Sequence, residues 1–179
     1  MGKIKHALKR SYDKLYVPFD KGAVDDAHTV RNEEFFAPVI ALLGEGKSVT
    51  IPVKGFSMLP FIRGRKDLVE IRKADTYRKR DIVLFDNHGR TILHRIVRVE
   101  GDNVTIQGDG VASNQEHVTL ADIHGKAVKI LRNGKREVNP DNRWQHFRSW
   151  LWDAFKWMRT PLIWTYRLLP WNYVWLRKQ

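Results

Sequence analysis

Ser57 and His94 are the two residues of this sequence whose chemistry suits nucleophilic catalysis. A serine hydroxyl attacks a carbonyl only when a base takes its proton. Histidine, whose pKa lies near neutrality, can take that proton and return it to a leaving amine. Ser57 lies close after Gly55 and three residues before Pro60, a pattern typical of a bend that exposes a short side chain. A turn serine and a structural strand histidine would give the same spacing, because such a pair is recognised by its geometry.

Four short motifs include these two residues and follow one another along the chain. They are residues 55–60 (GFSMLP), 80–85 (RDIVLF), 93–97 (LHRIV) and 108–110 (GDG). In this order they resemble the boxes of the signal peptidase I family, within the larger group that also holds LexA-type self-cleaving repressors. The resemblance extends over residues 48–131, and it implies a serine endopeptidase that needs no cofactor.

The resemblance implies a role for each residue of the pair. Ser57 would attack the scissile carbonyl. His94 would be the base, as in the endoplasmic-reticulum and archaeal enzymes, where the typical bacterial enzymes carry a lysine. An acyl-enzyme would form and be hydrolysed by water. The amide N–H of Ser57 is the expected oxyanion donor. Some relatives add a hydroxyl two residues before the serine, but this chain has Gly55 there, so a second donor is unidentified.

The acid that would orient His94 is where the sequence departs from this family. Histidine-type relatives carry one aspartate in the box matched by residues 108–110 and another several residues later. Asp109 holds the first position, and the stretch that follows reaches Glu116 without a further aspartate. Asp109 is therefore the predicted orienting acid, with Glu116 in a shifted register as the alternative, although a turn aspartate beside glycines would look the same. Arg95 would point to the opposite strand face from His94 and pair with an acid.

Composition limits the remaining chemistry. The chain has 179 residues, enough for one domain with a real core, and no cysteine, which excludes disulfides and metal–thiolate sites. The histidines show no metal-ligand spacing, so no metal is expected, and there is no glycine-rich phosphate loop. Residues 1–30 lack the apolar core of a signal peptide, and no stretch reaches the ~18–20 apolar residues of a transmembrane span. We therefore expect a cytoplasmic or peripheral membrane protein.

The apolar pattern predicts a mainly β fold, a small antiparallel coiled sheet or partial barrel. Strands are predicted over residues 49–53, 68–72, 81–85, 91–99, 103–107 and 126–131, with hairpin turns at residues 100–103 and at Asn133-Gly134. The chain divides into a basic flexible arm (1–30), a helix (31–46), the β peptidase domain (47–138) and a basic, Trp-rich amphipathic helical tail (139–179).

The tail combines aromatic residues with positive charge. All seven tryptophans lie between residues 144 and 175, and from residue 132 onward ten Lys and Arg outnumber three Asp and Glu. Between residues 144 and 159, most apolar side chains share one helical face, and Trp152 is the lone apolar residue on the polar face. The apolar face could pack on the β domain or on a partner protein. Alternatively, it could lie in an anionic membrane surface, with Trp150, Trp157, Trp164 and Trp171 as contacts. Nucleic acid is a third reading, which no known nucleic-acid-binding motif supports.

Together these patterns predict a serine endopeptidase of signal-peptidase type, acting on a peptide or protein substrate bound extended beside a strand edge. The alternative is a catalytically weak or inactive protein of peptidase fold that serves as a binding or adaptor module at a membrane surface. The two hypotheses differ in whether Ser57 and His94 lie close enough to exchange a proton.

Overall fold

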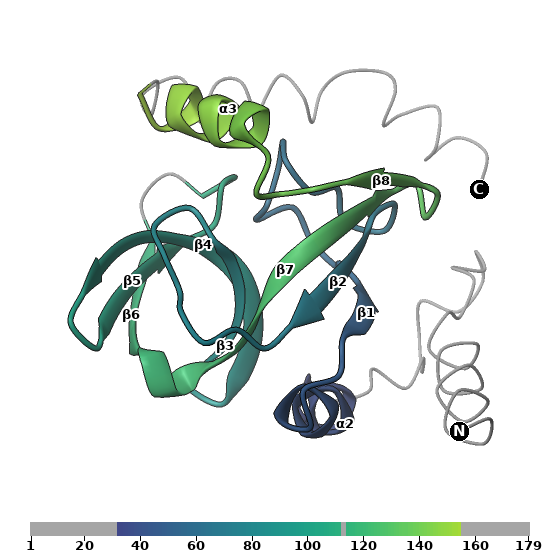
Figure 1. The fold of residues 1–179 in the computed structure, drawn as a ribbon, viewed down its shortest axis with the longest axis vertical. Helices are drawn as coiled ribbons and strands as arrows, with labels where there is room; N and C mark the ends of the chain where they lie inside the picture. Colours follow the sequence, from purple (N-terminus) through teal and green to yellow (C-terminus); the bar gives the residue numbers. More distant parts are fainter. Residues whose placement is uncertain (1–31, 112–113, 155–179) are drawn as a thin grey trace, which may run out of the picture.

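One antiparallel sheet forms the centre of the described part of the chain and curls on itself (Figure 1). The computed structural model describes residues 32–111 and 114–154. The strands in these ranges are β1 (Val49–Pro52), β2 (Leu68–Arg72), β3 (Ile82–Asn87), β4 (Arg90–Glu100), β5 (Asn103–Gln107), β6 (Gln115–Thr119), β7 (Ile123–Arg132) and β8 (Arg136–Val138). The helices are α2 (Asn32–Gly44), the short 3-10 helix η1 (Leu120–Asp122) and α3 (Arg143–Ala154).

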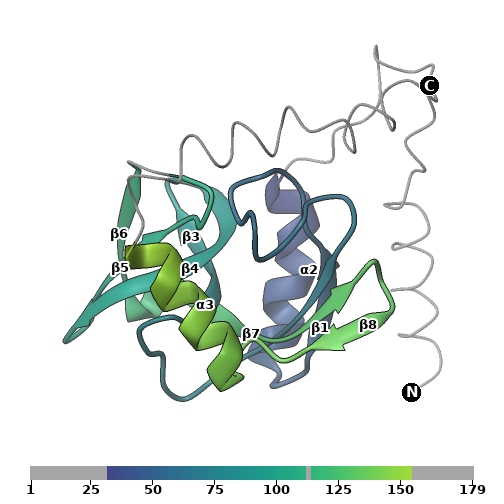
Figure 2. The same ribbon diagram turned by 90° about the horizontal axis from the view of Figure 1, so that it is seen from above.

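The strand order is β1-β2-β7-β3-β4-β5-β6, and β8 pairs with β7. In Figure 1, β3 to β6 form the strongly curled part, and β1, β2 and β7 extend from it. The two helices lie at opposite ends of the sheet, and the view from above places α3 across the near end with α2 behind it (Figure 2). The predicted mainly β fold, with a coiled sheet, an N-terminal helix and a C-terminal helix, is confirmed.

Two apolar clusters form the core. The first lies where α2 packs on β1, β4 and β7 and includes residues of β2, and Leu43 and Val69 are completely buried in it. The second fills the curled part of the sheet, around Phe85 and Ile106. Alternating side chains of a strand point to opposite faces, so the residues of β4 divide between the inside of the curl and its outside. This division decides which residues His94 can contact.

The predicted strands are present, but two strands, β6 and the short β8, were not predicted. β6 (Gln115–Thr119) has little apolar character, and no alternating pattern marks it. It is held by its pairing with β5, in which Ile106 lies opposite Glu116. Both predicted hairpins are confirmed: Glu100 pairs with Asn103, and Asn133 and Gly134 have φ of 52° and 70°, as a type I′ turn requires.

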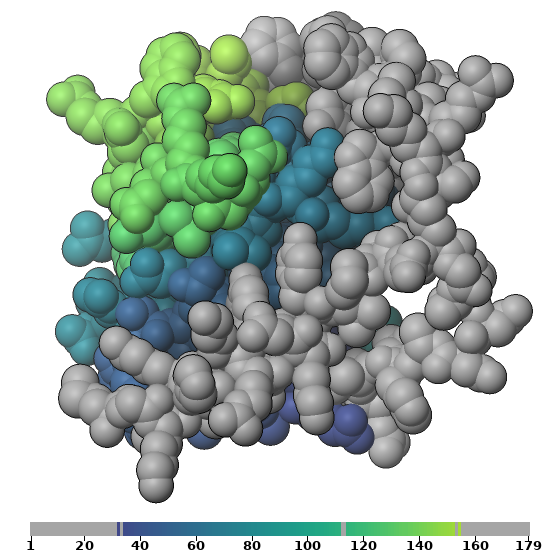
Figure 3. Space-filling view, turned by 90° about the vertical axis from the view of Figure 1, so that its right-hand side faces the viewer, coloured from purple at the N-terminus to yellow at the C-terminus, as the bar shows by residue number. Residues whose placement is uncertain are grey.

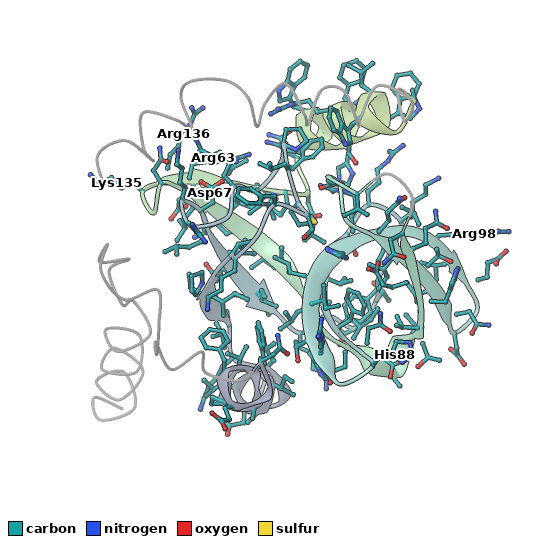
Figure 4. All side chains as sticks on the ribbon, turned by 180° about the vertical axis from the view of Figure 1, so that it is seen from behind. Arg63, Asp67, His88, Arg98, Lys135 and Arg136 are labelled. Carbon is teal, nitrogen blue, oxygen red and sulfur yellow. The ribbon has the colours of Figure 1, made fainter. Side chains whose placement is uncertain are left out.

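A buried carboxylate ties the loop that precedes β2 to the β7–β8 turn. Asp67 is 1% exposed and accepts hydrogen bonds from the Arg63 guanidinium (2.9 Å), the Arg63 backbone N–H (2.9 Å), Arg132 Nη1 (2.7 Å) and the Asn133 backbone N–H (3.1 Å). Figure 4 shows Arg63 and Asp67 beside this turn, together with Lys135 and Arg136. Figure 3 shows the molecule from the side, where the β7–β8 hairpin (green) lies next to residues from earlier in the chain (blue).

Asp67 is expected to make the stability of the fold sensitive to acid. Burial by itself raises the pKa of this carboxyl, but the hydrogen bonds from Arg63 and Asn133 and the charge of Arg132 outweigh burial and hold the pKa below its ordinary value of 3.8. A depressed folded-state pKa means that the stabilisation is fully present above pH 4 and is lost as the pH falls through the folded-state pKa. Asp67→Asn should lower the free energy of unfolding at pH 7 by about 3 kcal/mol, because the arginines lose their anion.

Urea unfolding at pH 7 and pH 3 tests this expectation, with Asp102→Asn in the exposed β4–β5 turn as the control. The difference in unfolding free energy between wild type and Asp67→Asn should shrink at pH 3. A difference that stayed the same at both pH values would show that the charge of Asp67 contributes nothing to folding.

Parts of the predicted tail lie outside the described residues. Trp150 is described on α3, whereas Trp157, Trp164 and Trp171 and the N-terminal arm fall outside residues 32–111 and 114–154. Within those ranges, no helix is long and apolar enough to cross a membrane. In the same ranges, no group of three or more His, Asp or Glu side chains could hold a metal ion.

Candidate active site

Ser57 lies in a tight turn that begins directly after β1. Gly55 has φ of 79°, a left-handed conformation that favours glycine and turns the chain out of the sheet. Met58 and Phe61 are buried and anchor the turn, and the Phe61 and Ile62 backbone N–H groups both donate to the Met58 carbonyl. Ser57 itself is partly exposed. The bend predicted from the sequence is therefore present, with the serine at its accessible surface.

His94 lies near the middle of β4 and is buried, with 6% of its surface exposed. It pairs with Val83 of β3, and its ring lies 6.3 Å from the ring of Phe85, measured between centroids. Its Nδ1 lies 3.4 Å from Oε2 of Glu116, which is also buried. The imidazole therefore faces the inside of the curl, with an acid at one ring nitrogen.

Gly108 brings the serine turn and the histidine together. A Cβ built on Gly108 would lie 2.7 Å from the Ser57 carbonyl oxygen and 3.0 Å from His94 Nε2. Two residues later, the Gly110 N–H donates a 2.7 Å hydrogen bond to the same Ser57 carbonyl. His94 Nε2 is the ring nitrogen that faces away from Glu116. It and the main chain of Ser57 therefore both lie next to Gly108. The Ser57 hydroxyl and amide N–H make no hydrogen bond to another described residue.

The two candidate acids have different partners: Glu116, the alternative acid, lies beside His94, and Asp109, the predicted one, does not. Asp109, predicted as the acid beside His94, instead forms a two-pronged ion pair with Arg95, at 2.8 Å to Nε and 2.8 Å to Nη2. Neighbouring strand residues point to opposite faces, so an acid on the Arg95 side of β4 cannot also meet His94. The expected pairing of Arg95 with an acid is confirmed. Glu116 lies on the His94 side because β6 pairs with β5 in the register that sets it opposite Ile106.

The motifs and the curled sheet agree with a comparison of the chain with known families. The model of a family described as Peptidase S24-like matches residues 18–142. The chain belongs to the Peptidase S24-like family. No curated protein matches its sequence. The family assignment supports a serine-type peptidase, the general class of enzyme that the motifs predicted.

The S24-like match ends at residue 142, yet α3, which begins at Arg143, also contacts the candidate site. Trp152 Nε1 donates a 2.7 Å hydrogen bond to the Asp109 carbonyl oxygen, and its ring packs edge-on against Phe61, with centroids 6.4 Å apart. Sequence reasoning missed this contact. The signal that could have found it was the position of Trp152 as the one apolar residue on the polar face of the predicted helix.

α3 packs on the S24-like domain through its polar face, whereas a surface helix ordinarily buries its apolar face. Ser149 and Trp152, from the polar face, lie toward the domain, and Ser149 is 1% exposed. The apolar face points outward, and its exposed residues are Trp144, Phe147, Trp150 and Leu151. Packing of the apolar face on the β domain, one of the alternatives for the tail, is therefore wrong for the described part of this helix.

Proposed function

We propose that this S24-like protein is a serine endopeptidase of signal-peptidase type, with Ser57 as nucleophile and His94 as general base. The observation that carries the proposal is the position of Gly108, which has the Ser57 carbonyl on one side and His94 Nε2 on the other. A serine in a tight turn near an imidazole nitrogen that faces away from the acid supports this proposal, which requires the hydroxyl to come within hydrogen-bond reach of Nε2 during the reaction.

The chemistry follows from the two nitrogens of His94. When the Nδ1–H donates to the Glu116 carboxylate, Nε2 carries the lone pair and can accept the Ser57 proton. Ser57 Oγ bonds to the scissile carbonyl carbon, the imidazolium gives its proton to the leaving amine nitrogen, and the C–N bond breaks. Water then attacks the ester while Nε2 takes its proton, and that proton returns to Ser57 as the acid product leaves. The Ser57 N–H is the proposed donor to the oxyanion.

The proposed substrate is a peptide segment in extended conformation. Among the described strands, β1 pairs only with β2, so its other edge can accept hydrogen bonds from an added strand. β1 leads into the Ser57 turn, and a strand added along this edge would carry a scissile bond toward the nucleophile. Phe56, which is 51% exposed and adjacent to Ser57, would lie beside such a peptide.

We further propose that Glu116 orients His94 and that Asp109 is structural. Glu116→Gln should lower the acylation rate of Ser57 by at least about tenfold, because the amide no longer stabilises the imidazolium.

Asp109→Asn should instead lower the free energy of unfolding, by about 3–5 kcal/mol, because it leaves the buried Arg95 without its anion. Acylation rates and urea unfolding of both variants separate the two roles. A large loss of rate in a fully stable Asp109→Asn protein, with wild-type hydrogen exchange of residues 107–111, would restore Asp109 as the orienting acid.

Labelling with a serine-directed acylating or phosphonylating probe tests the proposed function. Intact mass should show one adduct on wild type, peptide mapping should locate it on Ser57, and Ser57→Ala should remove it. Ser48→Ala, an exposed serine just before β1, is the matched control and should keep the adduct. Probes with chemically different warheads guard against a poor fit. Absence of any adduct from all of them would reject the peptidase proposal and favour the membrane-adaptor alternative.

A second property, contact with an anionic membrane, is proposed for the α3 side of the molecule. The rings of Trp144, Phe147 and Trp150 stack along the outward face of α3, with neighbouring centroids 5.7 and 5.9 Å apart. Lys135 and Arg136 are exposed and lie along the same edge of the molecule as α3 in Figure 4. Indole rings favour the membrane interface, and basic residues attract anionic head groups.

Binding of the full chain to vesicles tests this property. Lys135→Ala with Arg136→Ala should weaken binding to phosphatidylserine-containing vesicles by about 1 kcal/mol for each charge removed. Trp144→Ala with Trp150→Ala should also weaken it. The control removes two exposed basic residues at the α2 end, Lys47→Ala with Arg90→Ala, and should change co-sedimentation little. Equal binding of wild type to purely neutral vesicles, or equal loss in the control, would contradict this assignment of the surface.

A further inference from the structure

Trp152 connects α3 to both segments of the proposed active site. Its indole N–H holds the Asp109 carbonyl, which belongs to the loop at residues 108–110. Its ring contacts Phe61, which belongs to the turn that begins at Ser57. Phe61 also lies under two guanidinium groups, those of Arg95 at 5.0 Å and Arg148 at 5.6 Å from its ring centroid. One side chain from outside the family-matched residues therefore contacts both the nucleophile turn and the loop beside the base.

The loop at residues 108–110 is held from three directions. Arg95 binds the Asp109 carboxylate, the Gly110 N–H binds the Ser57 carbonyl, and Trp152 binds the Asp109 carbonyl. Asp109 is 4% exposed, so little water is available to replace the indole N–H if that donor is removed. Gly108 in the same loop has both Ser57 and His94 as near neighbours. A small displacement of this loop must therefore change the geometry between nucleophile and base.

We infer that Trp152 is a positioning residue of the peptidase. Its indole N–H holds the 108–110 loop where that loop sets the approach of Ser57 to His94, so α3 is part of the catalytic apparatus. The catalytic consequence rests on the proposed function, whereas the placement of the loop by Trp152 can be measured by itself. Catalysis responds steeply to such placement, because a displacement of about 1 Å can cost on the order of 100-fold in rate.

Trp152→Phe is the test, because phenylalanine keeps an aromatic ring against Phe61 and removes only the indole N–H and part of the ring. The first readout is the acylation rate of Ser57 as a function of probe concentration. The maximal rate should fall by about 10- to 100-fold, and the probe concentration that gives half of it should stay the same. The second readout is amide hydrogen exchange of residues 107–111, which should speed up locally. Trp150→Phe, on the exposed face of the same helix, is the control and should change neither.

Each outcome bears on the inference. Wild-type acylation and wild-type exchange in Trp152→Phe would overturn it. Faster exchange throughout the protein would also overturn it, because the role would then be general stability. If wild type itself reacts with no probe, the proposed function fails. Exchange of residues 107–111 then decides alone whether Trp152 holds the loop. Trp152→Leu extends the series, and a fall in rate seen only with leucine would assign the effect to ring packing and reject the role of the N–H.

Discussion

Replacing His94 with glutamine is expected to lower the rate of Ser57 acylation by about 10²–10⁴-fold, the range that a positioned general base contributes. Glutamine is polar and similar in length, so it can occupy the buried site on β4, but it cannot accept a proton from a serine hydroxyl. The neighbouring Phe85 and Glu116 stay in place, and the fold should be retained. The lower acylation rate would therefore measure the contribution of the imidazole as a base, because the packing around residue 94 is retained.

The measurement is the acylation rate from intact mass, with circular dichroism and thermal unfolding to verify the fold. His117→Gln is the matched control, since His117 is an exposed histidine on β6 whose Nδ1 lies 3.3 Å from Thr105 Oγ1, away from the candidate site. That variant should react as wild type does. A folded His94→Gln protein that kept wild-type reactivity would remove His94 from the mechanism and leave Ser57 without an identified base.

Gly108→Ala is expected to reduce acylation by about 100-fold, the loss that a displacement of about 1 Å produces in a catalytic arrangement. The added methyl would lie 2.7 Å from the Ser57 carbonyl oxygen, 3.0 Å from His94 Nε2 and 3.1 Å from Val111 Cγ2. A contact under 3.0 Å with backbone forces a shift, so the serine turn, the imidazole or the 108–110 loop must move. The backbone of Gly108 is outside the left-handed region, and the substitution therefore tests space alone.

Gly44→Ala serves as the control for this prediction, because a Cβ at Gly44 would meet nothing within 4 Å. Both variants should unfold cooperatively, and only Gly108→Ala should lose reactivity. Exchange of residues 107–111 would show whether the loop has moved. Full reactivity in Gly108→Ala would mean that the geometry around this glycine does not control the approach of Ser57 to His94.

Local features of the candidate active site were predictable from the sequence because they depend on neighbours along the chain. Gly55 before Ser57 predicted the bend, and the alternation of β4 predicted that Arg95 would face away from His94. The Asn133-Gly134 pair predicted a tight hairpin. Each of these follows from backbone sterics or from the two-residue period of a strand, which a short stretch of sequence carries in full.

The acidic partner of His94 was not predictable in the same way. Asp109 and Glu116 are both acids near the same motif, and the sequence leaves both open. The structure separates them by strand register: Glu116 shares the inner face of the curl with His94, and Asp109 is bound by Arg95. β6, which carries Glu116, has no apolar alternation of its own, so its existence depends on pairing with β5.

The sequence by itself determined the class of fold, the order of the motifs and the bend at Ser57, because backbone preferences and apolar periodicity act over a few residues. Only the tertiary structure decided which acid meets His94, how Gly108 lies between His94 and the Ser57 carbonyl, and which side of α3 faces the domain. Those choices depend on contacts between residues far apart in the chain. Trp152 and Asp109 are 43 positions apart, and only the folded packing brings the indole N–H to its carbonyl.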